Sequence, residues 1–247
     1  FEYREQTNLG EIRAFVEGDF RGDGDTFRLR HAFGQFRTIM AGKTWTTFMD
    51  VETIPEEVDI EGMNAAVLLR NSQIRWTPQF GEKYKLKLAL EDPKTDIVNG
   101  TSEKSRFDMV ASVVHMPLGP LGRWNYRVGV ILRELKGTAN VSTDVTTLPD
   151  SATGWGITTG GKQPITLWGS SEDFIAWQLT YGEGIGHYIN DLQTVGGGDA
   201  VFDPQGKLRA LPVLAGFLSY QHIWPKRMKF LRNWPGLLRS NFNLGMV

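Results

Sequence analysis

The chain has 247 residues, a formal net charge of −1 and no cysteine. This near-neutral charge argues against a general nucleic-acid binder, which is usually basic overall. The absence of cysteine excludes disulfides, thiol catalysis and thiolate metal sites. Fourteen Phe, eight Trp, six Tyr and 28 Gly favour strands and turns over long helices. No apolar run approaches the roughly 20 residues that a membrane-spanning helix needs.

Apolar and polar residues alternate along most of the chain, and this period of two predicts antiparallel β-strands. About twelve strand-like segments can be counted. The clearest lie at 10–20, 26–36, 37–47, 70–77, 84–91, 106–114, 124–133 and 171–182. Aromatic residues stand at several strand ends, next to faces that carry Arg and Lys. This combination is typical of a transmembrane β-barrel, with apolar residues toward lipid and polar residues toward a water-filled lumen.

Two strands, 26–36 and 37–47, form the hairpin before the first long connection. In the first strand the alternation places Arg28 and Arg30 on one face and Leu29 and Phe33 on the other. The same parity directs His31 outward. Residues 136–153 are rich in Thr, Ser and Asp and indicate a loop, and 154–162 indicates only a weak strand.

The connection at 48–68 is acidic. It carries six carboxylates and no basic residue between positions 48 and 61: Asp50, Glu52, Glu56, Glu57, Asp59 and Glu61. A loop of this length is either functional or disordered. Two interpretations remain open, a solvated surface loop and a loop that folds into a barrel lumen and sets its constriction.

Six short stretches resemble the DcaP-like family of outer-membrane porins. They are EGDF at 17–20, RLRHAFG at 28–34, AGKTWTTFMD at 41–50, LTYGEGIGHYINDL at 179–192, YQHIW at 220–224 and LRSN at 238–241. They occur in order over most of the chain. The resemblance implies a 16-stranded, homotrimeric diffusion channel in the outer membrane of Gram-negative bacteria, with a preference for small organic anions such as dicarboxylates. The sequence contains only about twelve strand-like segments, whereas the resemblance implies 16 strands. We therefore expect the single barrel domain, 1–247, to lack strands at both ends.

The parity of the strands collects basic side chains on the expected lumen face: Arg13, Arg28, Arg30, Arg75, Lys85, Lys87, Arg106, Arg127 and Arg133. Inside a low-dielectric wall such a basic ladder concentrates small anions, and guanidinium groups pair well with carboxylates. Asp50, Glu52 and Glu57 on an opposing constriction loop would add a transverse field. Alternatively, these arginines pair with Glu11, Glu17, Asp19 and Asp108 and stiffen the wall; we expect a mixture of both roles.

No catalytic residue, metal or cofactor is predicted. The four histidines, His31, His115, His187 and His222, lack metal-ligand spacing, and GEGIG at 182–186 lacks the context of a nucleotide-binding loop. Two other functional classes stay open. One is an outer-membrane barrel enzyme acting on lipids, for which His31 is the nearest candidate base. The other is a soluble β-sandwich that binds carbohydrate and would purify without detergent.

Two late segments suggest partners. Residues 207–222 predict a strand that is apolar on both faces, which fits a subunit interface, contact with an infolded loop, or a small pore whose interior is filled by side chains. Residues 225–236, PKRMKFLRNWPG, are basic and aromatic and would face either lipopolysaccharide or the periplasm. The expected surroundings are therefore outer-membrane lipid and lipopolysaccharide, with small anionic solutes in the lumen and no nucleic acid.

Overall fold

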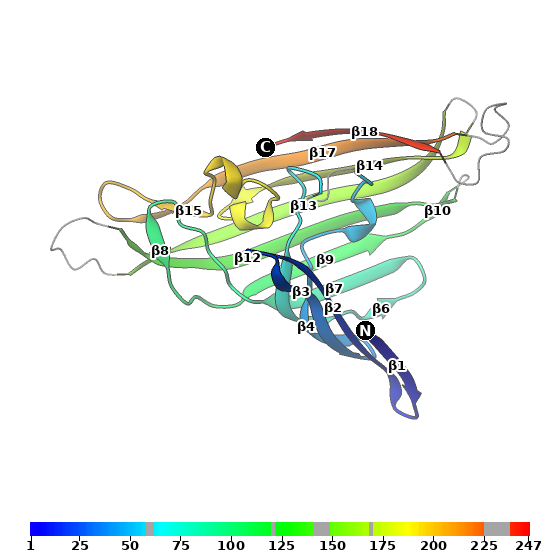
Figure 1. The fold of residues 1–247 in the computed structure, drawn as a ribbon, viewed down its shortest axis with the longest axis horizontal. Coiled ribbons are helices and arrows are strands. Elements are labelled where there is room, and N and C mark those ends of the chain that lie inside the picture. Colours follow the sequence, from blue (N-terminus) through cyan, green and yellow to red (C-terminus); the bar gives the residue numbers. More distant parts are fainter. Residues whose placement is uncertain (58–61, 120–121, 141–148, 168–169, 225–237) are drawn as a thin grey trace.

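The computed structural model shows an all-β chain, dominated by one large antiparallel sheet (Figure 1). It describes residues 1–57, 62–119, 122–140, 149–167, 170–224 and 238–247. Among these residues, no helix has the length and apolar character needed to cross a membrane.

Twelve strands pair with their neighbours in chain order along the main path of the sheet. They are β1 (Glu2–Thr7), β2 (Gly10–Gly22), β3 (Thr26–Phe36), β4 (Ile39–Trp45), β5 (Arg70–Trp76), β7 (Tyr84–Glu91), β9 (Asp108–His115), β12 (Asn125–Ala139), β13 (Asp150–Leu167), β14 (Ser170–Glu183), β17 (Pro212–Ile223) and β18 (Arg239–Met246). The all-β antiparallel fold predicted from the alternation is thus confirmed.

Shorter elements decorate this sheet. The strand β6 (Gln79–Phe80) pairs with β7 and β8 (Gly100–Ser102) pairs with β12, while β10 (Leu118–Gly119) with β11 (Gly122–Arg123) and β15 (Ala200–Phe202) with β16 (Leu208–Ala210) form two-stranded ribbons. Three single turns of 3-10 helix complete the described elements: η1 (Val51–Thr53), η2 (Gly186–Tyr188) and η3 (Gln193–Val195).

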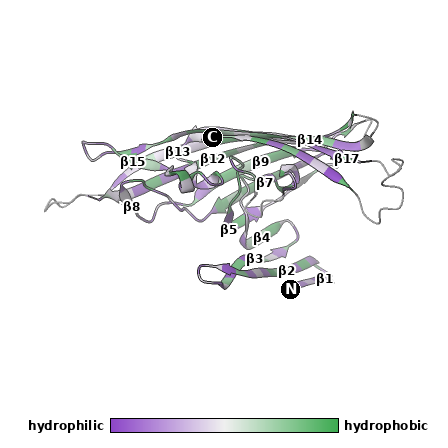
Figure 2. Ribbon diagram, turned by 45° about the horizontal axis from the view of Figure 1, so that its top comes forward, coloured by the Kyte–Doolittle hydropathy of each residue, from purple (hydrophilic) through white to green (hydrophobic). Residues whose placement is uncertain are grey.

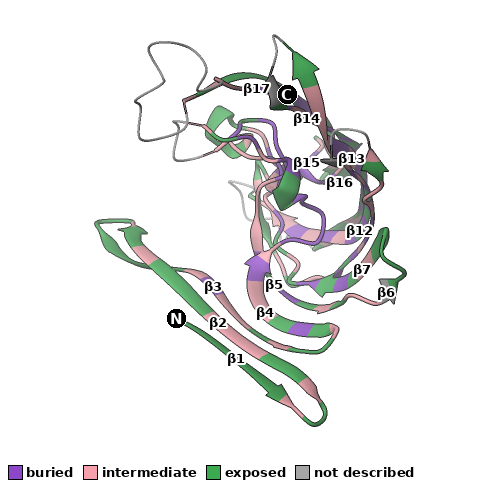
Figure 3. Ribbon diagram, turned by 90° about the vertical axis from the view of Figure 1, so that its right-hand side faces the viewer, coloured by how far each residue is buried: buried purple, intermediate pink, exposed green. Residues whose placement is uncertain are grey.

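Seen along the strands, the sheet is a curved wall (Figure 3). The strands from β4 to β17 bend around two connections that lie on the concave side, and the β1–β3 strands diverge from this arc. We call the concave side, where those connections pack, the inner face and the opposite side the outer face. The strand twist that all L-amino-acid sheets share accounts for this curvature.

The two faces invert the usual distribution of polarity. On the outer face, paired positions on neighbouring strands carry exposed apolar side chains, as in the row Ile74, Leu90, Met109 and Leu132. The inner face instead buries polar residues such as Gln73, Ser112, Thr158, Gln178 and Thr180. Hydrophobic and hydrophilic stretches therefore alternate along the strands in Figure 2. A soluble sheet would bury its leucines; this one exposes them.

Aromatic rings mark both ends of the apolar outer face. At one end Tyr84, His115 and Tyr126 are register partners on β7, β9 and β12, and the first two rings stack 4.5 Å apart. At the other end the rings of Trp155 and Tyr181 on β13 and β14 meet at 5.7 Å. Such paired aromatic belts are found where barrel strands cross the two membrane interfaces.

Two long connections fold onto the inner face. The β4–β5 segment (its described residues, 46–57 and 62–69) and the β14–β17 segment (residues 184–211) contact each other through a bridge between Val67 and Ile189 and a hydrogen bond from the Asn190 amide to the Ala66 carbonyl. The rings of Phe48 and Tyr188, both fully buried, meet at 5.8 Å in the core between them. The described residues of the acidic connection therefore fold onto the inner face and are not a solvated surface loop, while their role as a constriction stays a prediction.

The long late strand is explained by the same packing. On β17 the inner side chains Val213, Ala215 and Phe217 are buried, and Phe217 packs with Met63 and Ala66 of the β4–β5 segment. Leu214 and Leu218 point to the outer face. The inner apolar face of 207–222 thus contacts an infolded segment. Residues 225–236, as well as Asp59 and Glu61, lie outside the described residues.

Three expectations from the sequence were wrong. A register shift between β2 and β3 leaves Arg30 without a partner position, so His31 and Phe33 lie on the inner face and not on the outer one. Such an extra residue reverses the parity of everything after it. The predicted loop at 136–153 is shorter, because β12 continues to Ala139 and β13 begins at Asp150. Residues 154–162 belong to an 18-residue strand.

Candidate functional site

Arg133 is completely buried and holds the β14–β17 segment to the wall. Its guanidinium lies 3.3 Å from Asp108 on β9 and 3.2 Å from Asp199 on the segment. It also donates to the carbonyl oxygens of Gly184, at 3.0 Å, and Lys94. Burial raises the pKa of Asp199. One side chain of β12 thus joins the wall to two connections.

Arg127 plays the matching part for the β4–β5 segment. It is buried and donates to the backbone carbonyls of Phe48, at 2.9 Å, and Thr47. From β7, Glu91 accepts hydrogen bonds of 2.6 Å from both the Thr46 hydroxyl and the Thr47 amide. The segment is therefore fixed from two strands at the point where it enters the inner side.

The acidic residues of this segment have separate environments. Asp50 is buried, accepts a hydrogen bond from Asn125 at 3.3 Å and has its pKa raised by burial. Glu57 accepts from Asn243 on β18 at 3.1 Å, and the neighbouring Glu56 pairs with Arg239 at 2.6 Å. Carboxylates on this segment therefore reach across to the last described strand.

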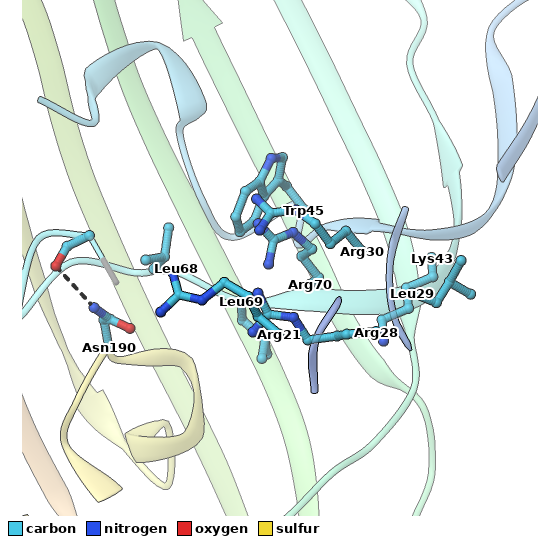
Figure 4. A pocket seen from close by; sticks show the side chains of 11 residues that line it. Arg21, Arg28, Leu29, Arg30, Lys43, Trp45, Leu68, Leu69, Arg70 and Asn190 are labelled. Atoms are coloured by element: carbon cyan, nitrogen blue, oxygen red, sulfur yellow. Dashed lines mark hydrogen bonds between the residues drawn. The ribbon is translucent and has the colours of Figure 1, made fainter. Parts of the chain in front are cut away.

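A basic pocket of about 620 Å³ lies where β3, the ends of β4 and β5 and both infolded segments meet (Figure 4). Five cationic side chains line it: Arg21, Arg28, Arg30, Lys43 and Arg70. The remaining lining comprises Leu29, Trp45, Gly62, Leu68, Leu69 and Asn190. We call this the basic pocket. Its walls combine positive charge with apolar surface, which suits an organic anion better than a bare ion.

The arginines of the basic pocket differ in whether they pair with a carboxylate of the protein. Arg28 pairs with Asp19 at 2.7 Å, and Arg30 lies 2.9 Å from Glu17 and 3.0 Å from Asp19. Within the described part of the chain, neither Arg21 nor Arg70 forms an ion pair with a carboxylate. The expected pairing with Glu17 and Asp19 is thus observed for two arginines of the pocket, while the attraction of anions by the others stays a prediction.

A second charged pocket, of about 280 Å³, lies at the opposite ends of β4 and β5. Arg75, Lys85 and Lys87 line one side of it, and Asp50 and Glu52 of the β4–β5 segment line the other. Basic wall and acidic segment therefore face each other here. We call this the charged pocket.

The last two predicted lining residues lie elsewhere. Arg13 is on the inner face of β2, where it pairs with Glu2 at 2.7 Å and covers the rings of Phe15 and Phe33 at 5.5 and 5.1 Å. Arg106 precedes β9 and is largely exposed, with Glu134 at 3.8 Å. Neither lines the basic or the charged pocket.

The histidine considered as a catalytic base has a geometry that disfavours that role. Arg70 Nε donates to His31 Nε2 at 3.3 Å, and an arginine can only donate. His31 must therefore carry its proton on Nδ1, which lies 3.0 Å from the Thr44 hydroxyl. In this tautomer His31 donates to Thr44 and cannot accept its proton, so the pair is not arranged to activate a nucleophile.

Several site residues were missed by sequence reasoning. Arg70 and Trp45 stand at strand ends, where alternation no longer predicts direction. Asp199 and the pair of His187 with Asp96, at 2.7 Å, depend on contacts between distant loops. The signal available for Arg70 was its place at the return of the acidic connection to the wall. Nothing in the sequence pattern marked Asp96 or Asp199.

Among solved structures, the chain is similar to the crystal structure of the outer membrane channel DcaP of Acinetobacter baumannii, with a TM-score of 0.78 and 18% sequence identity. The match covers 99% of this chain and 64% of that one. No family model and no curated protein matches the sequence. The fold implied by the motif resemblance is confirmed: the chain has the fold of this outer membrane channel and spans 64% of its length.

Proposed function

We propose that the protein is an outer-membrane porin, a diffusion channel for small hydrophilic solutes that favours organic anions such as dicarboxylates. The supporting observation is the position of the two pockets. The basic pocket and the charged pocket lie at opposite ends of β4 and β5, and both are lined by cations of the same stretch of wall. Anions that leave one cluster would meet the next, which is how lining charge selects among solutes.

The acidic side of the charged pocket refines this proposal. Asp50 and Glu52 face Arg75, Lys85 and Lys87 across a space of about 280 Å³. Opposed charges across a narrow space in a low-dielectric wall create a strong transverse field. A solute with separated charges would be oriented by it, while the excess of cations would favour net negative solutes. The β4–β5 segment, with Glu57 tied to β18, is the proposed constriction loop.

The surroundings follow from the outer face. Its exposed apolar rows and the two aromatic belts fit a band of outer-membrane lipid, with lipopolysaccharide at one interface. The homotrimer is proposed on the resemblance to DcaP-like porins. No chemical step and no cofactor is part of this proposal.

Planar-bilayer recording of the detergent-purified protein tests it. Under a tenfold salt gradient we expect conductance steps in groups of three and a reversal potential of anion sign. Arg106→Gln, outside both pockets, should leave the reversal potential unchanged, whereas Lys87→Gln should move it toward zero. Absence of conductance from correctly inserted protein would contradict the channel, and a cation sign would transfer control to the acidic segment.

A further inference from the structure

We propose that Arg70 is the specificity-determining contact of the basic pocket, at which the carboxylate end of a passing solute docks, and that Trp45 and His31 position it. This inference rests on the proposed function, since it assigns the discriminating step of anion passage to one side chain. The remaining cations would attract anions in general, whereas Arg70 would distinguish a carboxylate from chloride.

The guanidinium of Arg70 is available to a solute. Only its Nε has a hydrogen-bond partner among the described residues, the imidazole of His31. Its two terminal nitrogens form the fork that matches a carboxylate in bidentate fashion. Arg28 and Arg30, by contrast, already direct their guanidinium groups at Asp19 and Glu17.

Arg70 is also held in place before any solute arrives. Its guanidinium carbon lies 3.7 Å from the centroid of the Trp45 ring, the shortest such contact among the described residues. His31 fixes the Nε edge and is itself fixed by Thr44 at 3.0 Å. The Trp45 ring also contacts the His31 ring, at 5.4 Å. Because Trp45 covers the face of the Arg70 guanidinium and His31 holds its Nε edge, the side chain loses little rotamer freedom when it binds a carboxylate.

Arg21 is the competing arginine, since it too lacks a carboxylate partner among the described residues; Lys43 also lacks one but has no fork for a bidentate contact. Arg21 lies near the end of β2, next to the turn before β3, and none of the ring contacts among the described residues involves its guanidinium. An exposed cation that no ring holds contributes to the attraction of anions but not to their discrimination. Arg70 also adjoins Leu68 and Leu69 in the pocket lining, which offers apolar surface to the body of an organic anion.

The test compares succinate with chloride as probes in planar bilayers. Arg70→Lys keeps the charge but removes the fork, and we expect the succinate-to-chloride permeability ratio to fall about tenfold, the order of one bidentate contact. The anion-to-cation ratio in potassium chloride should stay within about twofold, because the other cations remain. Arg106→Lys, on the exposed connection before β9, is the matched control and should change neither ratio.

Trp45 is tested as a positioning residue by two variants. Trp45→Leu removes the ring beneath Arg70, and we expect about a threefold fall in the succinate-to-chloride ratio, the low end of a cation–π contact. Trp45→Phe retains a ring and should restore most of the ratio, which a loss of folding would not do. Each variant is first checked for an unchanged heat-dependent shift on electrophoresis and an unchanged trypsin pattern.

The outcomes are separable. If the wild-type protein shows no anion permeability, the proposed function and the assignment of Arg70 both fail. If the wild type prefers succinate but Arg70→Lys retains that preference, the assignment to Arg70 is wrong while the channel stands. An equal loss of chloride and succinate permeability in Arg70→Lys would also overturn it, since Arg70 would then be one generic charge among several.

Discussion

Replacing Arg133 by Met should release the β14–β17 segment while leaving the sheet intact. Met fills a similar volume but donates no hydrogen bond. It would leave the carboxylates of Asp108 and Asp199 buried and unpaired, together with the Gly184 and Lys94 carbonyls that Arg133 now serves. Tyr188, whose ring lies 5.2 Å from the guanidinium carbon, would lose that contact as well.

The magnitude follows from the completeness of this burial. Arg133, Asp108 and Asp199 each have 0% of their side chains exposed, so no solvent screening reduces the effect. Removing one partner of such a buried pair costs about 3–5 kcal/mol. Much of the cost is avoided if the segment undocks and lets Asp199 reach water. We therefore expect the docked-to-undocked ratio to fall by a factor of at least about 10², and of nearly 10⁴ at the upper end of that cost.

Limited proteolysis measures that ratio directly, because cleavage of a docked segment requires its opening. The rate of cleavage within 184–211 should rise about a hundredfold in Arg133→Met when opening is fast relative to cleavage. Asp199→Asn in the same background should recover part of the loss, since it removes one uncompensated charge. Arg106→Met is the surface control and should cleave at the wild-type rate.

An unchanged cleavage rate in Arg133→Met, with the strands folded by circular dichroism, would refute this reasoning. It would mean that the apolar contacts of Tyr188 and Ile185 hold the segment without the ion pairs. Cleavage throughout the chain would instead mean that Arg133 stabilises the whole sheet and not only the β14–β17 segment.

Three further predictions concern other residues. Gly42→Ala should lower the free energy of unfolding by about 2 kcal/mol, because Gly42 has a φ of +133° and an added Cβ would overlap the Ala32 carbonyl oxygen; denaturant midpoints with Gly34→Ala as control would show it. Arg75→Gln should reduce the anion-to-cation permeability ratio about twofold, since it removes one of three cations of the charged pocket, and an unchanged reversal potential would exclude Arg75 from the path. The hydrogen bond from His187 lowers the pKa of Asp96. The ionised Asp96 therefore stabilises the docked 184–211 segment fully above the ordinary Asp range, and this stabilisation is lost as pH falls through the lowered pKa. Cleavage within 184–211 should rise on acidification in the wild type and respond less in Asp96→Asn.

Alternation predicted the strands well because a half-buried sheet imposes a strict period of two. It predicted the face of Arg75, Lys85, Lys87, Arg127 and Arg133 correctly, since their strands have no irregularity before them. It failed at His31 because one extra residue reverses parity, and a bulge at Arg30 has no signature in a Gly-poor stretch. Local pattern carries strand direction only as far as the next bulge.

What parity could not predict is whether an inner side chain meets water or another segment. Arg127 and Arg133 have the same parity as Lys87, yet they bind backbone carbonyls of connections far away in the chain. That outcome depends on where the 46–69 and 184–211 segments fold, which is decided by contacts such as the one between Val67 and Ile189. No local pattern contains this information.

The inner face therefore divides its cations between two tasks. On β12 both arginines are buried and bind the infolded segments. Arg133 forms ion pairs with Asp108 and Asp199, and Arg127 donates to a backbone carbonyl. On β3, β5 and β7 the cations still line open pockets. If the proposed channel selects anions, its selectivity should depend on that second wall, and neutralising Arg127 should change segment docking before it changes ion preference. Mutation would then separate the arginines that hold the segments from the cations that select solutes, although the sequence pattern places both groups in one basic ladder.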